Sequence, residues 1–474
     1  MKKPAATGRT LMKITLEKGK ELPFKEAAER YGWRLCGDLS GVGSVCTDSR
    51  EAEAGSLFAA IRGERVDGHD YIGKAYLSGY RAALCERIPD GAPGDMAFAV
   101  VPDTVTALNH LAGLFFEKRK GKVIGVTGSV GKTTTKEFVA AAFGKRRVYR
   151  TKGNFNSTIG FPLSVMEIPE NTEFSVLEMG MSGRGEIALM SSSAKPDIAM
   201  ITNVGSSHLE LLGSRENIRA AKYEITEGLK DDGTLLINGD DAMLTSFETE
   251  KRRLTCGFGE SCDIRAVNIR NDGACSIFDI AYEGKMLRDV KIPVIGDHNV
   301  RAALFGFAAA HLCSLGEEEI VSELALFEKP KMRQNIYEKS GIIFIEDCYN
   351  ASPESMRAAL DVLKGLSDSR DGARTVALLG DMLELGETSA ALHRSVGEYA
   401  AKTGLSALVT FGELAENIAD GAGMPLTVRV KDKNDPEAAA DALASILKKG
   451  DILLVKASRG IAAERVIKIL EERL

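Results

Sequence analysis

The chain has 474 residues, an apolar share of 44% and a formal net charge of -6, from 61 Lys and Arg against 67 Asp and Glu. At ordinary domain size this length predicts about three domains, and the apolar share lets each of them bury a core. The slightly acidic balance argues against a nucleic-acid-binding or membrane-binding surface, because either usually needs a basic face.

Eight cysteines are scattered along the chain, without a Cys-x-x-Cys pair or the spacing of a metal site. They indicate free thiols in a reducing compartment. Lys2 and Lys3 stand near the N-terminus, but no apolar run follows them, and no stretch is apolar enough to span a bilayer. We therefore expect a cytoplasmic protein with no membrane insertion and no nucleic-acid partner, and we expect a monomer.

The first region, residues 1–118, mixes short strand-like runs such as 56–61 with Gly-rich turns. Apolar residues then recur at helical spacing from Val105 to Phe115. The basic run 118–122 is typical of a solvated linker. This pattern predicts an N-terminal α/β domain.

Two further regions, 119–329 and 330–474, alternate apolar runs with helical patterns. The second region begins with an apolar strand at 123–126, and its later strands end near Glu178, Asn203 and Asn238. The third region has apolar runs that end in polar residues, at 342–345, 376–379 and 452–455. Such alternation predicts parallel α/β sheets, which bind ligands at the carboxyl ends of their strands. The predicted fold class is α/β in three domains, with a central phosphate-loop domain and a C-terminal Rossmann-like domain.

The clearest local motif is a phosphate loop at residues 125–135, where an apolar strand gives way to a Gly-rich turn and a helical pattern. Backbone N–H groups of such a turn can cradle phosphate oxygens, Lys132 can reach the β- and γ-phosphates, and the Thr133 hydroxyl can bind Mg²⁺. Val126 stands where the strict pattern has glycine. An accidental Gly-Lys-Thr in a Gly-rich turn is the alternative, but the strand–turn–helix context favours a nucleotide site.

One lysine of the second region falls on the apolar side of a predicted helix. Lys222 shares a stripe at helical spacing with Ile218, Ala221, Ile225 and Leu229, whereas Arg219 and Glu224 fall off this stripe. Burial would favour its neutral amine, unless the stem packs and the ammonium reaches solvent. Glu178, His208 and Glu210 lie at or just past strand ends, so they are candidate ligands for a phosphate-bound cation.

Together these motifs resemble those of the Mur ligase family, and the likeness covers nearly the whole chain. The family's signatures are similar to residues 127–134, 154–163, 178–186, 202–210, 296–300 and 347–353. In the first region, 47–50 and 67–70 resemble the family's UDP-binding domain. In the third, 347–356 and 379–386, followed by His393, most resemble members that use D-alanyl-D-alanine. The chain departs from the usual family residues at Ser157, Ala302, Met332 and Ala457.

The resemblance implies ATP-dependent ligation of D-alanyl-D-alanine to UDP-N-acetylmuramoyl-tripeptide, with Mg²⁺, through an acyl phosphate. The product would be the pentapeptide precursor of peptidoglycan. A sister ligase that adds a single amino acid to UDP-N-acetylmuramoyl-dipeptide is the alternative within the family. A folate polyglutamylation-type ligase and an NTP-hydrolysing switch are further alternatives, which the uridine-binding pattern and the inward Lys222 respectively disfavour.

The resemblance also implies roles for individual residues. The nucleotide contacts that it implies are Gly128, Ser129, Val130, Gly131, Lys132, Thr133, Thr134, Asn299, Arg333, Asp347 and Asn350. The UDP-substrate contacts that it implies are Asp48, Ser49 and Arg50. It implies catalytic roles for Lys132, Glu178, His208 and Lys222. Thr133 and Glu178 would hold one Mg²⁺, and His208 with a carbamylated Lys222 the second. Closure of the third region over the second is expected to keep water from the acyl phosphate.

Overall fold

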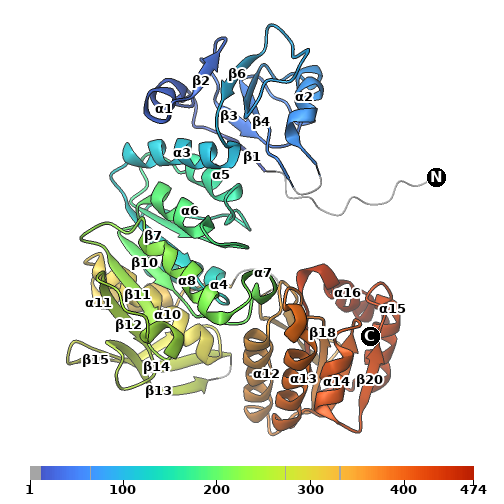
Figure 1. Ribbon diagram of the computed structural model, residues 1–474. Coiled ribbons are helices and arrows are strands. Elements are labelled where there is room, and N and C mark those ends of the chain that lie inside the picture. Colours follow the sequence, from blue (N-terminus) through green and yellow to red (C-terminus); the bar gives the residue numbers. More distant parts are fainter. Residues whose placement is uncertain (1–11, 64–65, 273, 330–332) are drawn as a thin grey trace. The chain divides into compact units, whose positions relative to one another are not determined.

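The structure is a computed structural model that describes residues 12–63, 66–272, 274–329 and 333–474 (Figure 1). The expectations about Lys2 and Lys3, the start of the third region at residue 330 and the departure at Met332 lie outside the described residues. The described chain forms two compact units, and each is described by itself. One holds the residues up to Gly125 with Lys145–Ala199 and Tyr223–Thr234, and the other holds Val126–Gly144, Met200–Lys222 and Leu235–Leu474.

The first sheet has six strands in the order β1-β3-β4-β5-β6-β2. Its strands are β1 (Lys13–Thr15), β2 (Arg34–Cys36), β3 (Ser44–Cys46), β4 (Ser56–Ala59), β5 (Ala82–Cys85) and β6 (Ala97–Val100). Strands β3 to β6 pair in parallel, and β1 and β2 are antiparallel edges. The helices of this region are α1 (Phe24–Tyr31), α2 (Ile72–Ser78) and α3 (Thr104–Glu117). Helix α3 confirms the helical spacing seen between Val105 and Phe115.

The second sheet has nine strands in the order β15-β14-β13-β12-β11-β10-β7-β9-β8. They are β7 (Lys122–Thr127), β8 (Val148–Arg150), β9 (Phe174–Glu178), β10 (Ile198–Ile201), β11 (Thr234–Asn238), β12 (Arg252–Gly257), β13 (Ile264–Asp272), β14 (Cys275–Tyr282) and β15 (Lys285–Ile292). The accompanying helices are α4 (Lys132–Ala142), α5 (Gly160–Met166), α6 (Glu186–Ala194), α7 (Leu209–Leu212), α8 (Arg215–Tyr223), α9 (Ala242–Thr245), α10 (Asp297–Leu312) and α11 (Glu317–Leu324).

The prediction of a parallel central sheet missed an antiparallel extension. Strands β12 and β13 pair in parallel, but β13 with β14 and β14 with β15 pair antiparallel. Glu283 and Gly284, which join β14 to β15, both have positive φ, 46° and 74°. A two-residue connection of this kind reverses the chain and makes a hairpin, whereas a parallel pair needs a long crossover.

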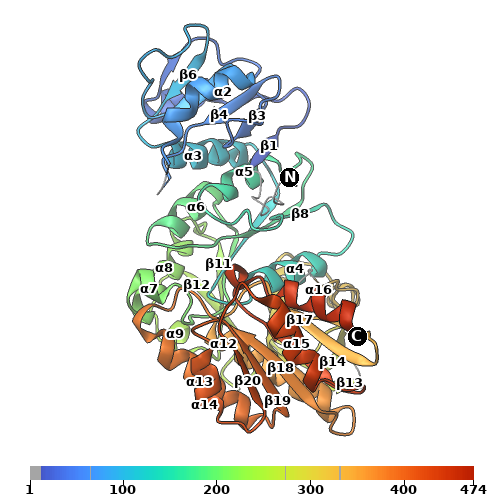
Figure 2. The same cartoon turned by 90° about the vertical axis from the view of Figure 1, so that its right-hand side faces the viewer.

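The third sheet has the order β16-β17-β21-β18-β19-β20, and only its edge strand β16 is antiparallel. Its strands are β16 (Asn335–Lys339), β17 (Ile342–Asp347), β18 (Thr375–Gly380), β19 (Ala407–Phe411), β20 (Thr427–Val430) and β21 (Ile452–Lys456). Its helices are α12 (Pro353–Asp368), α13 (Ser389–Lys402), α14 (Glu416–Ala422), α15 (Pro436–Ile446) and α16 (Glu464–Arg473), seen from a second side in Figure 2.

Alternate residues of these strands enter two separate hydrophobic cores, one on each face of the third sheet. Helices α12, α13 and α14 cover the face that includes Ile345 and Leu454, and α15 and α16 cover the face that includes Phe344 and Val455. The helix after β17 and the helix after β21 therefore leave toward opposite faces. Adjacent strands of this kind open a crevice at their carboxyl ends, where α/β sheets bind ligands.

The α/β fold class in three sheets is thus as predicted from the sequence. Each sheet falls within one of the three predicted regions, and the boundaries themselves stay predictions. Among the described residues, no helix is both long enough and apolar enough to cross a lipid bilayer.

Helix α12 begins at the crevice with a capping box. The Ser352 hydroxyl accepts a hydrogen bond from the Ser355 backbone N–H at 3.3 Å, and the Ser355 hydroxyl accepts one from the Ser352 backbone N–H at 2.9 Å. Pro353 occupies the first helical turn, where no N–H partner is lost. These bonds satisfy N–H groups that the first turn of a helix cannot pair.

Replacing Ser352 with Ala should loosen the first turn of α12, because an N-cap side chain contributes about 1 kcal/mol to the helix. Hydrogen exchange in a peptide covering residues 353–357 should then accelerate about fivefold, the factor that corresponds to this free energy. Ser369→Ala, at the exposed C-terminal end of the same helix, should leave that exchange unchanged. Equal exchange in the wild type and in Ser352→Ala would contradict the capping role.

Candidate active site

The residues predicted to contact the UDP substrate form a turn after strand β3. The Asp48 carboxylate accepts hydrogen bonds from the Arg50 backbone N–H at 3.0 Å and from its guanidinium Nε at 2.8 Å. The Tyr80 hydroxyl donates to the Asp48 carbonyl at 2.8 Å. Ser49 is buried, whereas the Arg50 side chain is 58% exposed. The turn therefore presents a permanently charged guanidinium, a group suited to phosphate oxygens.

The neighbouring stretch at 67–70 is held by its own hydrogen bonds. The Asp67 carboxylate accepts from the His69 backbone N–H at 3.0 Å, lies 2.6 Å from His69 Nδ1 and accepts from Arg87 at 3.0 Å. The bond from the His69 backbone N–H, with the Arg87 charge, lowers the pKa of Asp67. His69 Nε2 accepts from the Glu86 backbone N–H at 2.8 Å, so its proton lies on Nδ1. These two side chains shape the backbone of the loop.

The phosphate loop joins β7 to α4 as predicted. Gly131, with φ of 81°, precedes the helix, and α4 begins at Lys132. A Cβ on Gly128 would lie 1.9 Å from the Thr202 hydroxyl, so only glycine fits at this close approach. Lys132 Nζ donates to the carbonyls of Gly128, at 2.7 Å, and Ser129, at 3.3 Å. The loop backbone therefore holds the ammonium beside the helix N-terminus, where anions bind.

The stretch after β10 supports this loop from beside it. Asn203 accepts from the Val130 backbone N–H at 2.9 Å and donates to the Val130 carbonyl at 3.0 Å. The Ser129 hydroxyl accepts from the Gly205 backbone N–H at 2.9 Å. The backbone N–H of Val130, one of the predicted nucleotide contacts, is therefore engaged by Asn203. The family signature at 202–210 thus helps to position the loop.

The predicted nucleotide contacts Thr133 and Thr134 occupy the first turn of α4, and Thr133 is buried. Lys222 ends a neighbouring stretch of the same unit, in the last turn of α8, and is 1% exposed. The alternative of an ammonium that reaches solvent is therefore wrong. Burial lowers the pKa of Lys222 well below its ordinary value of 10.5, and the nearby positive charge of Lys132 lowers it further.

The helix around Lys222 is shorter than its apolar stripe predicted. It ends at Tyr223, a 3₁₀ turn follows, and Ile225 and Leu229 are buried beyond it. Glu224, expected on the polar side, is 7% exposed and accepts from the Gly185 backbone N–H at 2.9 Å and from Arg184 at 3.0 Å. The expectation for Glu224 was wrong because the change of helix type turns its carboxylate toward the N-terminus of α6.

Glu178, the last residue of β9, is 2% exposed. Its Oε1 accepts from the Asn156 side-chain amide at 2.7 Å, and its backbone N–H donates to the Thr151 hydroxyl at 2.9 Å. The signature stretch at 154–163 therefore orients the carboxylate through Asn156. A buried carboxylate at a strand end is a suitable ligand for a hard cation.

His208 directly precedes α7 with φ of 65°. Its Nδ1 lies 2.7 Å from Glu384 Oε2, and this contact lowers the pKa of Glu384. Glu384 belongs to the third-region stretch at 379–386. The family-like stretches at 202–210 and 379–386 therefore meet at this contact.

Nowhere in the described part of the chain do three His, Cys, Asp or Glu side chains gather into a possible cation site. The predicted Mg²⁺ ligands do not require such a group, because each predicted pair contains a donor of another kind. Glu178 is paired with the Thr133 hydroxyl, and His208 with a carbamate on Lys222. Glu178 belongs to the first unit, and Thr133, His208 and Lys222 belong to the second. Carboxylate and hydroxyl oxygens are the hard donors that Mg²⁺ prefers, with water and phosphate completing its shell. The donor chemistry fits Mg²⁺.

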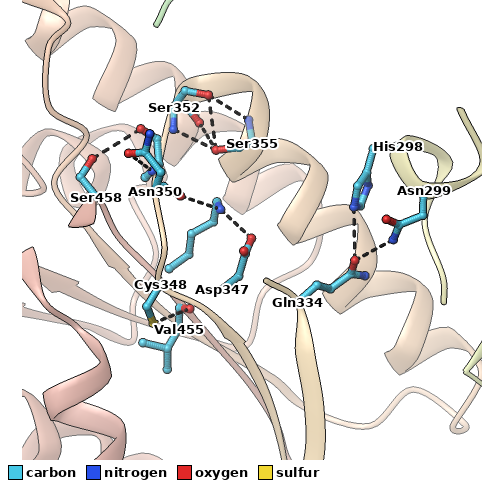
Figure 3. Close-up of polar contacts among 12 residues, drawn as sticks. His298, Asn299, Gln334, Asp347, Cys348, Asn350, Ser352, Ser355, Val455 and Ser458 are labelled. Carbon is cyan, nitrogen blue, oxygen red and sulfur yellow. Dashed lines mark hydrogen bonds and ion pairs between the residues drawn. The ribbon is translucent and has the colours of Figure 1, made fainter. Parts of the chain in front are cut away.

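Asn299, one of the predicted nucleotide contacts, is buried at the start of α10. Its side-chain amide donates to the Ile295 carbonyl at 2.8 Å and to Gln334 Oε1 at 2.7 Å, as Figure 3 shows for Gln334. His298 Nε2 lies 3.2 Å from the same Gln334 oxygen, and burial lowers the pKa of His298, so the neutral ring donates there. Both N–H bonds of Asn299 are therefore used within the protein. Gln334, which directly follows the predicted contact Arg333, was not predicted as a residue of the site.

The remaining predicted contacts lie at the crevice of the third sheet. Asp347 and Lys456, at the ends of β17 and β21, are register partners. Lys456 Nζ donates to Asp347 Oδ2 at 2.6 Å and to the Asn350 carbonyl at 3.1 Å. The Arg333 guanidinium lies 4.2 Å from the centroid of the Tyr349 ring. The structure thus places Arg333, Asp347 and Asn350 around one loop. Lys456 was not predicted as their partner, although a charged residue at the end of an apolar strand indicated it in the sequence.

Comparison with known proteins matches all three regions. Family profiles described as "Mur ligase family, catalytic domain", "Mur ligase middle domain" and "Mur ligase, glutamate ligase domain" match residues 42–112, 126–310 and 332–459. A UDP-N-acetylmuramoyl-tripeptide–D-alanyl-D-alanine ligase of Bacillus subtilis (strain 168) is 39% identical over 433 residues, which cover 90% of this chain and 93% of that protein.

Two solved structures are similar over nearly their whole length. MurF from Acinetobacter baumannii gives a TM-score of 0.85 at 29% identity, covering 97% of this chain and 100% of that one. MurF ligase from Thermotoga maritima, in complex with ADP, gives a TM-score of 0.81 at 31% identity, covering 92% and 99%. The similarity therefore extends through all three sheets.

Replacing Lys222 with Met should change how stability depends on pH. Between the lowered pKa in the folded protein and 10.5, the unfolded chain binds a proton that the folded chain does not. The free energy of unfolding therefore gains a contribution that is complete above 10.5 and is lost as the pH falls toward the folded pKa. Lys222→Met should lose this dependence and be the more stable protein at low pH.

The measurement is thermal unfolding in CO₂-depleted buffer from about pH 6 to about pH 10, comparing slopes against pH. Lys364→Met, which removes an exposed lysine, should keep the wild-type slope. Identical slopes in Lys222→Met and the wild type would show that Lys222 stays protonated in the folded protein.

Proposed function

Because the chain belongs to the Mur ligase family, we propose that it joins D-alanyl-D-alanine to UDP-N-acetylmuramoyl-tripeptide with cleavage of ATP to ADP and phosphate. The relative named for this reaction is 39% identical across 90% of the chain. The third-region stretches at 347–356 and 379–386 favour this substrate over a single amino acid. The product is the pentapeptide precursor of peptidoglycan.

The observation that carries the proposal is the buried Lys222, near the charge of Lys132 in the phosphate loop. A nucleotide switch needs the loop but has no use for a neutral lysine amine beside it. A neutral amine can capture CO₂ as a carbamate, which replaces a cation by an anion close to the phosphates. An anion there answers the charge of a bound cation, as ligation chemistry on ATP requires.

In the proposed reaction the tripeptide carboxylate attacks the γ-phosphorus of ATP, and ADP leaves. The amine of D-alanyl-D-alanine then attacks the acyl carbon, loses a proton, and phosphate leaves from the tetrahedral intermediate. Lys132 and the N–H groups at the start of α4 stabilise the charge on the transferred phosphoryl group. Thr133 and Glu178 would hold one Mg²⁺, and His208 and the carbamate of Lys222 the second. Bound Mg²⁺ supplies positive charge on the phosphate oxygens.

The other contacts follow the three regions. Asp48, Ser49 and Arg50 hold the UDP group of the substrate, and residues 128–134 hold the phosphates of ATP. Arg333, Asp347 and Asn350 contact the nucleotide from the third region. Asn299, whose side-chain amide is bound to Gln334, lies on the adenine side of the nucleotide. Closure of the third region on binding keeps water from the acyl phosphate. We further infer a cytoplasmic enzyme, since it uses ATP and a UDP-linked substrate and none of its eight cysteines is part of a disulfide among the described residues.

Phosphate release tests the reaction directly. ATP with UDP-N-acetylmuramoyl-tripeptide should give rapid release only when D-alanyl-D-alanine is added, and mass spectrometry should find the pentapeptide product. Lys132→Ala, which removes the phosphate-loop ammonium, should lower kcat/KM by at least about a hundredfold with the fold intact. Equal release without an amine would mean a hydrolase. A product from UDP-N-acetylmuramoyl-dipeptide and a single amino acid would mean the sister ligase.

Lys222→Ala removes the carbamate, so it should be nearly inactive. It should still fold, because the loss of a buried charge need not harm packing. A short carboxylate such as formate or acetate should restore part of the activity, since it supplies the missing anion beside the cation. A short alkylamine should restore none. Rescue by the amine and not by the carboxylate would show that Lys222 acts as a cation.

A further inference from the structure

Lys456 is a buried charge that the proposed reaction leaves without a role. It ends the apolar strand β21 and is 2% exposed. An ammonium is stable at such a position only when its charge and its N–H groups are satisfied. Its two partners are Asp347 Oδ2 at 2.6 Å, on the last residue of β17, and the Asn350 carbonyl at 3.1 Å, in the loop between β17 and α12.

The place of this ion pair follows from the topology of the third sheet. The parallel register sets Asp347 beside Lys456 at the ends of adjacent strands. Helix α12, after β17, packs on one face of the sheet, and α16, after β21, packs on the other. The pair therefore lies at the point where the helices of adjacent strands leave toward opposite faces, which is where α/β sheets bind their ligands.

The end of β21 holds the same loop at further points. The thiol of Cys348, which lies within residues 347–352, donates to the Val455 carbonyl at 3.4 Å. The buried Ser458 hydroxyl donates to the Ala351 carbonyl at 3.5 Å, and it accepts from the Leu383 backbone N–H of the loop after β18 at 3.0 Å. Figure 3 shows Cys348 and Val455 on one side of the loop and Ser458 beside Asn350 on the other.

We propose that Lys456 is a positioning residue for the nucleotide. Its ammonium holds the loop 347–352 in the conformation that turns Asp347 and Asn350 toward ATP, and it acts through them. The inference rests on the proposed function, because it takes Asp347 and Asn350 as nucleotide contacts. Loss of Lys456 should therefore affect the binding of ATP and not that of the UDP-linked substrate, since the UDP group is assigned to the turn at 48–50, which does not depend on this loop.

The test is a comparison of Michaelis constants in the full-length enzyme. Lys456→Met keeps the length and the apolar stem of the side chain and removes only the ammonium. It should raise the KM for ATP about tenfold or more and change the KM for UDP-N-acetylmuramoyl-tripeptide less than about twofold. Lys339→Met removes an exposed lysine of the same region, paired with Glu471 at 3.1 Å, and should change neither constant.

A purely structural ion pair gives a different pattern. Loss of folded enzyme lowers the apparent kcat and leaves both KM values as they were, and that result would overturn the inference. Thermal unfolding of each variant, with and without ADP, measures the folded fraction and reports nucleotide binding without turnover. A wild-type shift of the unfolding temperature by ADP in Lys456→Met would also overturn it.

Asp347→Asn separates this inference from the proposed function. An unchanged KM for ATP in Asp347→Asn would mean that the loop does not belong to the nucleotide site, and the inference would then fail as well. A raised KM for ATP in Asp347→Asn together with an unchanged KM for ATP in Lys456→Met would overturn only the role of Lys456. The double variant Lys456→Met/Asp347→Asn leaves no unpaired charge at this position, so it is expected to fold at least as well as the single lysine variant. Its KM for ATP should rise less than the product of the two single effects. A full product would mean that Lys456 contacts the nucleotide itself.

Discussion

A lysine charge with little access to water must be hydrogen-bonded, paired with an opposite charge or lost, and this constraint accounts for much of the candidate site. Lys132 donates to two carbonyls of the phosphate loop, Lys456 pairs with Asp347, and burial moves Lys222 toward its neutral amine. The three solutions have different chemical consequences. A carbonyl-bound ammonium can still turn to a phosphate, a carboxylate-bound one is held in place, and a neutral amine can react.

The positions of these lysines follow from the sheets. Apolar strands run to the carboxyl edge and stop at a polar residue, so the first side chains past each strand meet at that edge. In the third sheet, α12 and α16 cover opposite faces, and the crevice opens between β17 and β21. Asp347 and Lys456, which end these two strands, are partners in the parallel register. A carboxylate opposite an ammonium satisfies both.

Support for the site comes from signature stretches whose residues bind one another. Asn203 holds the phosphate loop, Asn156 orients Glu178, and Gln334 engages Asn299. Each is an amide, and an amide can donate and accept at once, so it can fix a backbone or a second side chain in a single orientation. Such contacts keep catalytic groups in place before any substrate binds.

Patterns that repeat along the chain could be predicted from the sequence. The strands at 123–126, 342–345 and 452–455, the phosphate loop and the burial of Lys222 all rest on residues within about two helical turns of one another, where apolar periodicity decides which side faces the core. The composition of the motifs also led to the family. The helix around Lys222 was right in its buried side and wrong in its length, because periodicity does not record where an α-helix gives way to a 3₁₀ turn.

The choice of partner was decided by the tertiary structure alone. Asn299 and Gln334 are 35 residues apart, and Lys456 and Asp347 are 109 apart. Glu224 and Gly185 are 39 apart. Sequence spacing contains no information about such pairs, because a hydrogen bond forms only within about 3 Å and only the packed sheets bring the groups that close.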